Sequence, residues 1–224
     1  ASATSDKRGM QDVDFDEEAR KLFAALNLPP SGIGTSAAAH RRGYRPLDAV
    51  YRHPQTGAQV FIGNQEASQN IEILKKSGIS CIVNCTDSMP NVFEDRPSAS
   101  IEYYRFDIYK HMRGMNLRRG HEGVLEAFEP MFAWVDSKVN AGKGVLIHCL
   151  AGAHRAGTTG VAYTMHAAKL NHRTAIAACQ TCRPEVHPIC DLSELLRQLD
   201  IAMEQKRKRE GTQAPSTAAP GGAT

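Results

Sequence analysis

The strongest constraint on the fold is a short apolar run at residues 144–148 (GVLIH), which begins with a glycine. Such a run is typical of a central strand that is buried on both faces of a parallel sheet. Strand-like and helical patterns alternate along the rest of the chain. The strand-like segments are 48–52, 59–62, 79–84 and 101–106, and the helical ones are about 66–76, 121–140, 155–169, 172–182 and 191–206. We therefore predict an α/β fold with a central, mostly parallel sheet flanked by helices.

An extra helix is predicted ahead of this fold. Apolar residues recur at helical spacing between 13 and 27, behind an acidic start that complements the helix dipole and includes Asp14, Asp16 and Glu17. The small, polar or low-complexity composition of the two ends is typical of disorder. The predicted boundaries are a disordered segment at 1–11, the N-terminal amphipathic helix and linker at 12–43, the α/β domain at 44–206, and a disordered tail at 207–224.

The composition argues against several classes of partner. The 27 basic and 24 acidic residues give a net charge of +3, which is too even a balance to call for a nucleic acid. No apolar run is long enough to cross a membrane, and the start of the sequence lacks the apolar core of a secretory signal. The six cysteines indicate reduced thiols, so we expect a cytoplasmic protein. We also expect the protein to be a monomer. The run 206–209 (KRKR) is either a nuclear address or a charged helix end.

The residues that carry chemistry follow the apolar run, in the segment 148–155 (HCLAGAHR). Cys149 stands at the end of the predicted strand and near the positive end of the next helix, a position that favours a thiolate. The loop between them can turn its backbone N–H groups inward around an anion, with Gly152 supplying a positive φ. Arg155 offers a planar fork for two phosphoryl oxygens. The predicted phosphate-binding residues are Leu150, Ala151, Gly152, Ala153 and His154.

This segment resembles the HCxxGxxR motif of the cysteine-dependent protein tyrosine phosphatases. Residues 60–84 and 183–199 resemble the first strand–helix–strand and the closing segment of the atypical dual-specificity members, so the resemblance covers roughly 46–203. It implies that Cys149 forms a cysteinyl-phosphate, that an aspartic acid protonates the leaving oxygen, and that water then releases phosphate without a metal or other cofactor. It also implies that His148 orients the loop. The implied partner is a protein phosphorylated on tyrosine, serine or threonine.

Two positions depart from this family's usual pattern. Ala156 stands where most members have a serine or threonine, whose hydroxyl helps the thiolate to leave. Thr158, on the first turn of the next helix, either offers its hydroxyl to Cys149 instead or bonds back to the preceding turn. His154 occupies a position that is often small, so it either reaches the phosphate or fills a gap at the surface.

The general acid is the third departure. Asp107 is the only carboxylate between Tyr103 and His121, and we take it as the acid. It lies farther from Cys149 than is usual in the family, and an ungapped comparison puts Lys110 in the acid's place. The alternative is that Asp107 is a strand-end carboxylate paired with a basic neighbour, in which case Asp87 is the next residue to consider.

Other functions remain open on the sequence alone. The same loop resembles those of glucan and lipid phosphatases, although it has no lysine to meet the additional phosphates of a lipid headgroup. A weakly active, phosphate-binding pseudophosphatase is a further alternative, because of Ala156 and the displaced acid. Cys85, at the end of another strand, either guards Cys149 through a reversible disulfide or is simply a small buried residue.

Overall fold

The sheet in the computed structural model, which describes residues 13–26, 28, 44–114 and 122–213, has five strands in the order β1-β2-β5-β3-β4. The β1 strand pairs antiparallel with β2, and the other neighbouring pairs are parallel. This arrangement confirms the predicted central, mostly parallel sheet. The strands are β1 (Leu47–Arg52), β2 (Gln59–Gly63), β3 (Ile79–Asn84), β4 (Glu102–Arg105) and β5 (Gly144–His148).

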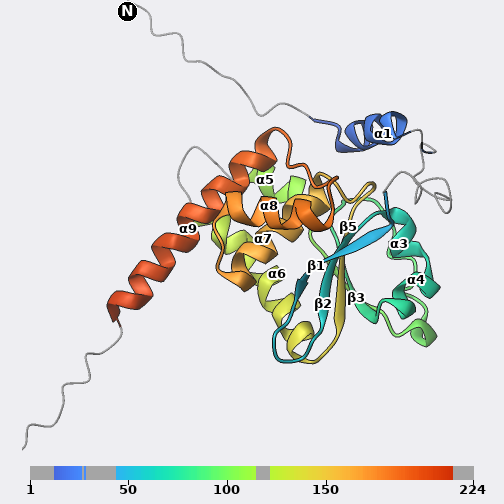
Figure 1. Cartoon of the computed structure of the whole chain (residues 1–224), viewed down its shortest axis with the longest axis horizontal. Helices are drawn as coiled ribbons and strands as arrows, with labels where there is room; N and C mark the ends of the chain where they lie inside the picture. Colours follow the sequence, from blue (N-terminus) through green and yellow to red (C-terminus); the bar gives the residue numbers. More distant parts are fainter. Residues whose placement is uncertain (1–12, 27, 29–43, 115–121, 214–224) are drawn as a thin grey trace, which may run out of the picture.

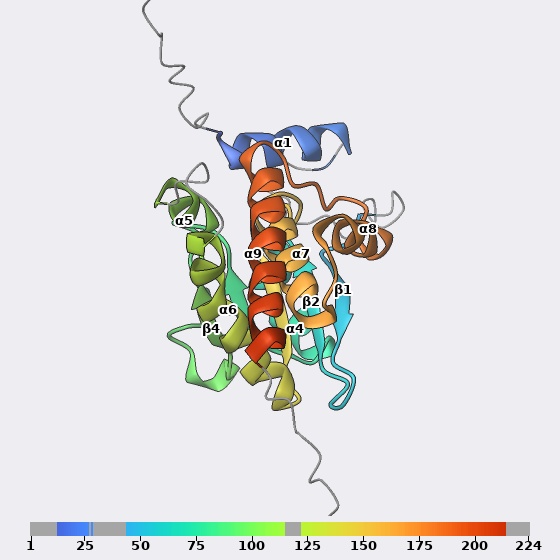
Figure 2. The same cartoon turned by 90° about the vertical axis from the view of Figure 1, so that its left-hand side faces the viewer.

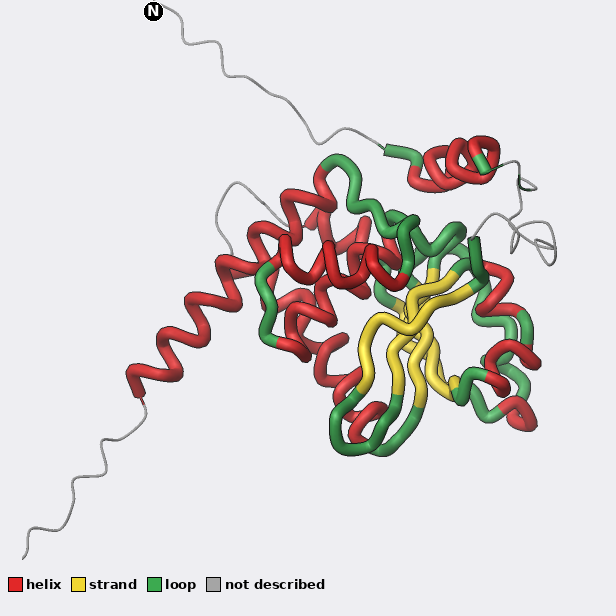
Figure 3. The backbone as a smooth tube through the Cα atoms, viewed as in Figure 1, coloured by secondary structure: helices red, strands yellow, loops and turns green. Residues whose placement is uncertain are grey.

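Helices cover both faces of this sheet (Figures 1 and 3). The short helices α3 and α4 lie on one face, and α6, α7 and α8 lie on the other, with α9 packed outside α6 and α7 (Figure 2). The extra N-terminal helix is present as α1. In the described residues the helices are α1 (Phe15–Ala25), α3 (Gln65–Gln69), α4 (Ile71–Lys76), α5 (Ile108–Gly114), α6 (Glu122–Asn140), α7 (Arg155–Ala168), α8 (His172–Cys182) and α9 (Asp191–Gln213), and a 3-10 turn spans Pro97–Ala99.

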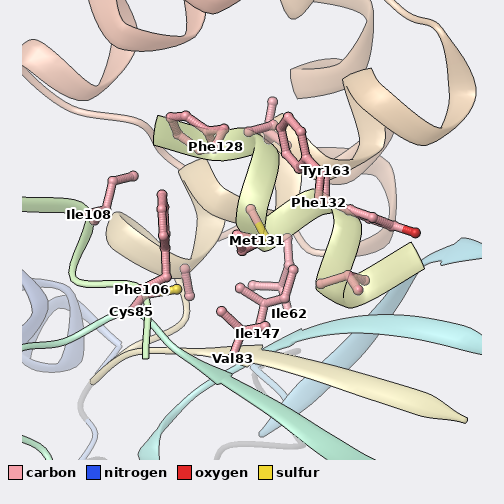
Figure 4. Packing of buried hydrophobic residues seen from close by; sticks show 14 of the residues in the cluster. Ile62, Val83, Cys85, Phe106, Ile108, Phe128, Met131, Phe132, Ile147 and Tyr163 are labelled. Atoms are coloured by element: carbon pink, nitrogen blue, oxygen red, sulfur yellow. The ribbon is translucent and has the colours of Figure 1, made fainter. Parts of the chain in front are cut away.

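The hydrophobic core is divided by the sheet. On one face, Ile62, Val83 and Ile147 point toward Met131 and the aromatic side chains of α6 and α7 (Figure 4). The alternate strand residues face the other way, against α3 and α4; they include Phe61, Ile82 and Leu146. Every residue of β5 is buried. Strand β5 is therefore the central buried strand that the sequence predicts, and it fixes where the following loop begins.

The observed helices differ from the predicted ones in places. The helix expected over 66–76 is two helices, because Asn70 adopts an extended backbone between them and its side chain accepts hydrogen bonds from the next helix's first turn. Residues 108–114 form α5, where no helix was predicted. In contrast, α6 continues through Pro130 as one element.

The predicted tail boundary at residue 207 is wrong. Helix α9 continues to Gln213, so residues 207–213 are helical rather than disordered. Ion pairs one turn apart stabilise this exposed end, including one of 2.7 Å between Lys208 Nζ and Glu204 Oε1. The predicted disordered segments at 1–11 and 214–224 lie outside the described residues. Within the described ranges, no helix is both long and apolar enough to span a bilayer.

Candidate active site

The carboxyl end of β5 carries the loop that the sequence singles out. Strand β5 ends at His148, Cys149 follows with only 3% of its surface exposed, and α7 begins at Arg155. The neighbouring strands β2 and β3 run parallel to β5, so three strand ends meet at this edge. Open α/β sheets bind their ligands at such an edge. The predicted order of strand, cysteine, loop and helix is confirmed.

The carbonyl groups of this loop are held from outside it. The Leu150 carbonyl accepts from the Gln65 N–H at 3.1 Å, and the Ala153 carbonyl accepts from the His187 N–H at 3.0 Å. The Ala151 carbonyl accepts from the Tyr44 hydroxyl at 2.9 Å. No amide N–H of residues 150–154 has a partner among the described residues. With the carbonyls fixed outward, these donors are available to an anion inside the loop.

Arg183 is the main support beneath the loop. Its guanidinium donates to the Gly152 carbonyl from Nε at 2.9 Å and to the Ala151 carbonyl from Nη2 at 3.0 Å. The remaining nitrogen, Nη1, donates to Asp48 Oδ2 at 2.8 Å, and both side chains are almost fully buried. The sequence placed Arg183 in a family-like segment but gave no sign that it holds the loop.

Gly152 adopts the positive φ that the sequence predicts, +64°. A Cβ atom at this position would lie 2.5 Å from the Gly63 carbonyl oxygen and 3.0 Å from the Arg183 Nη2 atom. Both the backbone conformation and the close approach of β2 therefore require glycine here.

Arg155 faces both Cys149 and the N-terminal helix. Burial works against its charge, but the nearby Cys149 and Asp16 outweigh that effect, so the pKa of Arg155 lies above its ordinary value. Its Nη2 atom donates to Asp16 Oδ1, and its Cζ atom lies 6.0 Å from the centre of the Phe15 ring. The buried Nε atom has no hydrogen-bond partner within the described ranges. The sequence did not foresee the contact with Asp16, which it had assigned only to the helix dipole.

Two fully buried side chains lie behind the loop. Burial lowers the pKa of His148 to about 3, so its ring is neutral at physiological pH. Cys85 lies beside this strand end, where its N–H donates to the His148 carbonyl at 2.9 Å. Burial above all raises the pKa of the Cys85 thiol, and the charges of Cys149 and Asp107 add to the shift. Cys85 and His148 therefore lie next to each other at the carboxyl edge of the sheet.

The hydroxyl of Thr158 bonds back to the preceding turn, which is the second of the two arrangements considered above. It donates to the His154 carbonyl at 2.7 Å, and the hydroxyl of Thr159 donates likewise to the Arg155 carbonyl at 3.0 Å. The His154 ring is buried, with Nδ1 2.8 Å from the His187 carbonyl oxygen. His154 therefore ties the loop to the segment after α8.

Asp107 stands between β4 and α5. Its Oδ1 atom accepts from the Lys110 N–H at 3.1 Å and so caps the first turn of α5, and the carboxylate is partly exposed. Lys110, the residue that an ungapped comparison puts in the acid's place, is exposed. Asp87 is also exposed, and Oδ1 accepts from the Ser88 N–H and hydroxyl; these bonds lower the pKa of Asp87.

No metal-binding arrangement accompanies these residues. In the part of the chain that the structure describes, no three His, Cys, Asp or Glu side chains are grouped so as to hold a metal ion. What the site offers instead is a cysteine, an arginine and, within the described residues, amide N–H groups of the loop that have no partner, with Asp107 at the same edge of the sheet. That set can bind a tetrahedral oxyanion and present a sulfur nucleophile to it.

Comparison with known proteins identifies where this arrangement recurs. The family model of the dual specificity phosphatase catalytic domain matches residues 60–201. Among curated proteins, dual specificity protein phosphatase Mpk3 of Drosophila melanogaster is 31% identical over 129 residues, which cover 58% of this chain and 29% of that protein. The chain spans about a third of the length of the first curated relatives that it matches.

Solved structures share the fold. A mouse dual specificity phosphatase complexed with zinc tungstate matches with a TM-score of 0.57 and 22% identity, covering 72% of this chain and 91% of that one. PTPMT1, in complex with PI(5)P, matches with a TM-score of 0.56 and 13% identity, covering 73% of this chain and 99% of that one. Proteins with different bound ligands therefore have this architecture.

Proposed function

Because this chain belongs to the dual specificity phosphatase family, we propose that it removes phosphate from phosphotyrosine and phosphoserine or phosphothreonine in proteins, through a cysteinyl-phosphate on Cys149. The family and the fold support a phosphatase. The observation that carries the mechanism is the set of outward-held carbonyls, which leaves the amide donors of residues 150–154 free for a phosphoryl group.

In the first step, the Cys149 thiolate attacks the phosphorus of the substrate. The sulfur–phosphorus bond forms as the bond to the leaving oxygen breaks, and the three remaining phosphoryl oxygens stay in the loop. Donors already aimed at those oxygens stabilise the charge of the transition state without having to reorganise. Arg155 adds a planar pair of donors, for which its unpartnered Nε atom is available.

Asp107 donates its proton to the leaving oxygen in the same step. In the second step, a water molecule attacks the phosphorus, passes a proton to Asp107, and breaks the bond to sulfur to release inorganic phosphate. Asp107 follows the end of β4, which runs parallel to β3 and β5, so it lies at the same edge of the sheet as the loop, and this placement supports the assignment. Ala156 leaves the departing thiolate without the hydroxyl that many family members provide.

Trapping the intermediate tests this proposal. Rapid acid quench of the protein with a phosphorus-labelled aryl phosphate should leave label on Cys149, identified by peptide mass. Cys149→Ser should bind inorganic tungstate but take up no label and show no turnover, because a serine hydroxyl stays protonated where a thiol ionises. Absence of label from the wild-type chain would make it a phosphate-binding pseudophosphatase.

Protein is favoured over lipid as the substrate. The side chains of residues 150–154 include no lysine or arginine that could meet additional headgroup phosphates. A panel of phosphopeptides, phosphoinositide vesicles and phosphorylated glucan should therefore show the highest kcat/KM with phosphopeptides. Faster hydrolysis of either alternative would reassign the substrate while leaving the chemistry unchanged.

A further inference from the structure

We propose that helix α1 is a built-in competitor for the phosphate site, with the Asp16 carboxylate taking the place of a phosphoryl oxygen on Arg155. This inference rests on the proposed function, since it assigns the guanidinium of Arg155 to substrate phosphate. Helix α1 lies over the carboxyl end of the sheet, at the same end as the loop (Figures 1 and 2). It also lies outside the part of the chain that matches the family, residues 60–201.

The contact with Arg155 is direct. Nη2 of the arginine donates to Asp16 Oδ1, and the Arg155 side chain is only 8% exposed. The Phe15 ring lies beside the same guanidinium and meets the Tyr109 ring edge to face, with the centroids 5.7 Å apart. Tyr109 is on α5, two residues after Asp107. Phe15 is thus placed between the arginine and the segment that carries the proposed acid.

The rest of α1 is seated on the loop itself. Ala19 and Phe23 are buried in a small cluster with Tyr44 and with three residues of the phosphate-binding loop: Leu150, Ala151 and Ala153. The Phe23 and Tyr44 rings meet edge to face at 6.2 Å. Because Tyr44 also donates to the Ala151 carbonyl, the helix packs on the support of the loop. This apolar face holds Asp16 in register with Arg155.

The charges favour competition over support. A phosphate monoester is a dianion that needs the same guanidinium, and a carboxylate beside it repels it. A supporting carboxylate has a different setting in this protein: Asp48, which holds Arg183, is 4% exposed, whereas Asp16 is 40% exposed. An exposed partner on a helix held by a small apolar face can be displaced. Substrate then binds only the fraction of molecules in which Asp16 has left, which weakens its apparent affinity.

Tungstate binding by the full chain tests the competition without needing turnover. Asp16→Asn should bind inorganic tungstate about tenfold more tightly than the wild type in a calorimetric titration. KM for an aryl phosphate should fall by a similar factor, with kcat little changed. Unchanged or weaker tungstate binding would overturn the proposal and make Asp16 a positioning residue for Arg155.

Glu17→Gln is the matched control, because it removes one negative charge from the same turn. Glu17 is 62% exposed and pairs with Lys21, not with Arg155. This variant should leave tungstate affinity within twofold of the wild type. An equal gain in both variants would reduce the effect to general electrostatics and refute a specific competitor.

A second variant separates the helix from the charge. Ala19→Gln keeps a good helix former and adds no charge, but its longer side chain does not fit against the loop. It should also raise tungstate affinity, with Asp16 intact; no gain would contradict competition by a docked helix. Together with the labelling experiment, these measurements distinguish failure of the competitor from failure of the proposed function. If Asp16→Asn binds tungstate more tightly but no phosphate label is found on Cys149, the competition by α1 is supported and the proposed phosphatase activity is refuted.

Discussion

The two arginines on either side of the phosphate-binding loop differ in how their donors are used. Beneath the loop, Arg183 is fully buried and donates to Gly152, Ala151 and Asp48. On the outer side, Arg155 is nearly as buried, but within the described residues its guanidinium donates a single hydrogen bond, to the partly exposed Asp16. One guanidinium has its donors committed to the fold, while the other keeps donors for a ligand.

This difference assigns stability and chemistry to opposite sides of one short loop. The underside of the loop, which includes Arg183, Asp48, Tyr44 and His148, is buried. Substitutions there should change the free energy of unfolding, because they strand polar groups inside the protein. The outer side consists of Arg155 and partly exposed carboxylates, so substitutions there should change rates and affinities while the fold persists.

Arg155→Lys should have the largest effect on the outer side. A lysine keeps the charge but cannot grip two phosphoryl oxygens in one plane, so turnover should fall about 10²–10³-fold. The urea midpoint should move little, since Asp16 is exposed enough to be hydrated. Steady-state kinetics with an aryl phosphate, together with urea unfolding, measure both. Near-normal turnover would break the distinction between the two arginines.

Arg183→Met should have the largest effect on the underside. The methionine fills much of the same volume but leaves Asp48 and two loop carbonyls without their buried donor. We expect the free energy of unfolding to fall by about 3 kcal/mol. Chemical denaturation at one pH measures it. If stability is retained and only turnover is lost, Arg183 belongs with the reacting groups and the comparison fails.

Asp107→Asn sharpens the description of the outer side. Asparagine also caps helices well, so α5 should persist. Hydrolysis of alkyl phosphates should slow by about 10²-fold and hydrolysis of activated aryl phosphates much less, because a good leaving group departs without a proton. Paired assays of a phosphoserine peptide and an aryl phosphate measure the ratio. Equal slowing of both substrates would make Asp107 a structural cap only.

The pH dependence of stability gives the smallest effect, on the underside. The pKa of His148 in the folded protein is about 3, below its ordinary value of 6.5. As the pH falls below about 6.5, the unfolded chain therefore takes up a proton that the folded protein excludes, and stability falls by up to about 1.4 kcal/mol per pH unit. The free energy of unfolding, measured with urea at pH 7 and at pH 5, should fall less between these two pH values in His148→Gln than in the wild type. An equal fall in both proteins would mean that His148 is protonated in the folded protein.

The sequence predicted the parts of the site whose geometry is local. The segment from His148 to Arg155 contains a strand end, a glycine with positive φ and a helix start, all within eight consecutive positions. Short-range rules fix such a turn wherever the flanking strand is buried. In contrast, α5 was missed because its cap, Asp107, was considered as an acid or as a strand-end carboxylate, but not as the cap of a helix. The split at Asn70 was missed because the apolar spacing continues across it.

The contacts that support and cover the loop were decided by tertiary structure alone. Arg183 and Gly152 are 31 positions apart in the chain, and Asp16 and Arg155 are 139 apart. Neither pair has a spacing that a local pattern could show, because an arginine at a helix end and an acid in a first turn each have an ordinary local role. The sequence by itself determined that Cys149 and the loop proposed to bind phosphate lie at a strand end. Only the tertiary structure decided that Arg183 is buried beneath that loop and that Arg155 contacts α1. The reason is that a buried charge needs a partner, and here the partners come from distant parts of the chain.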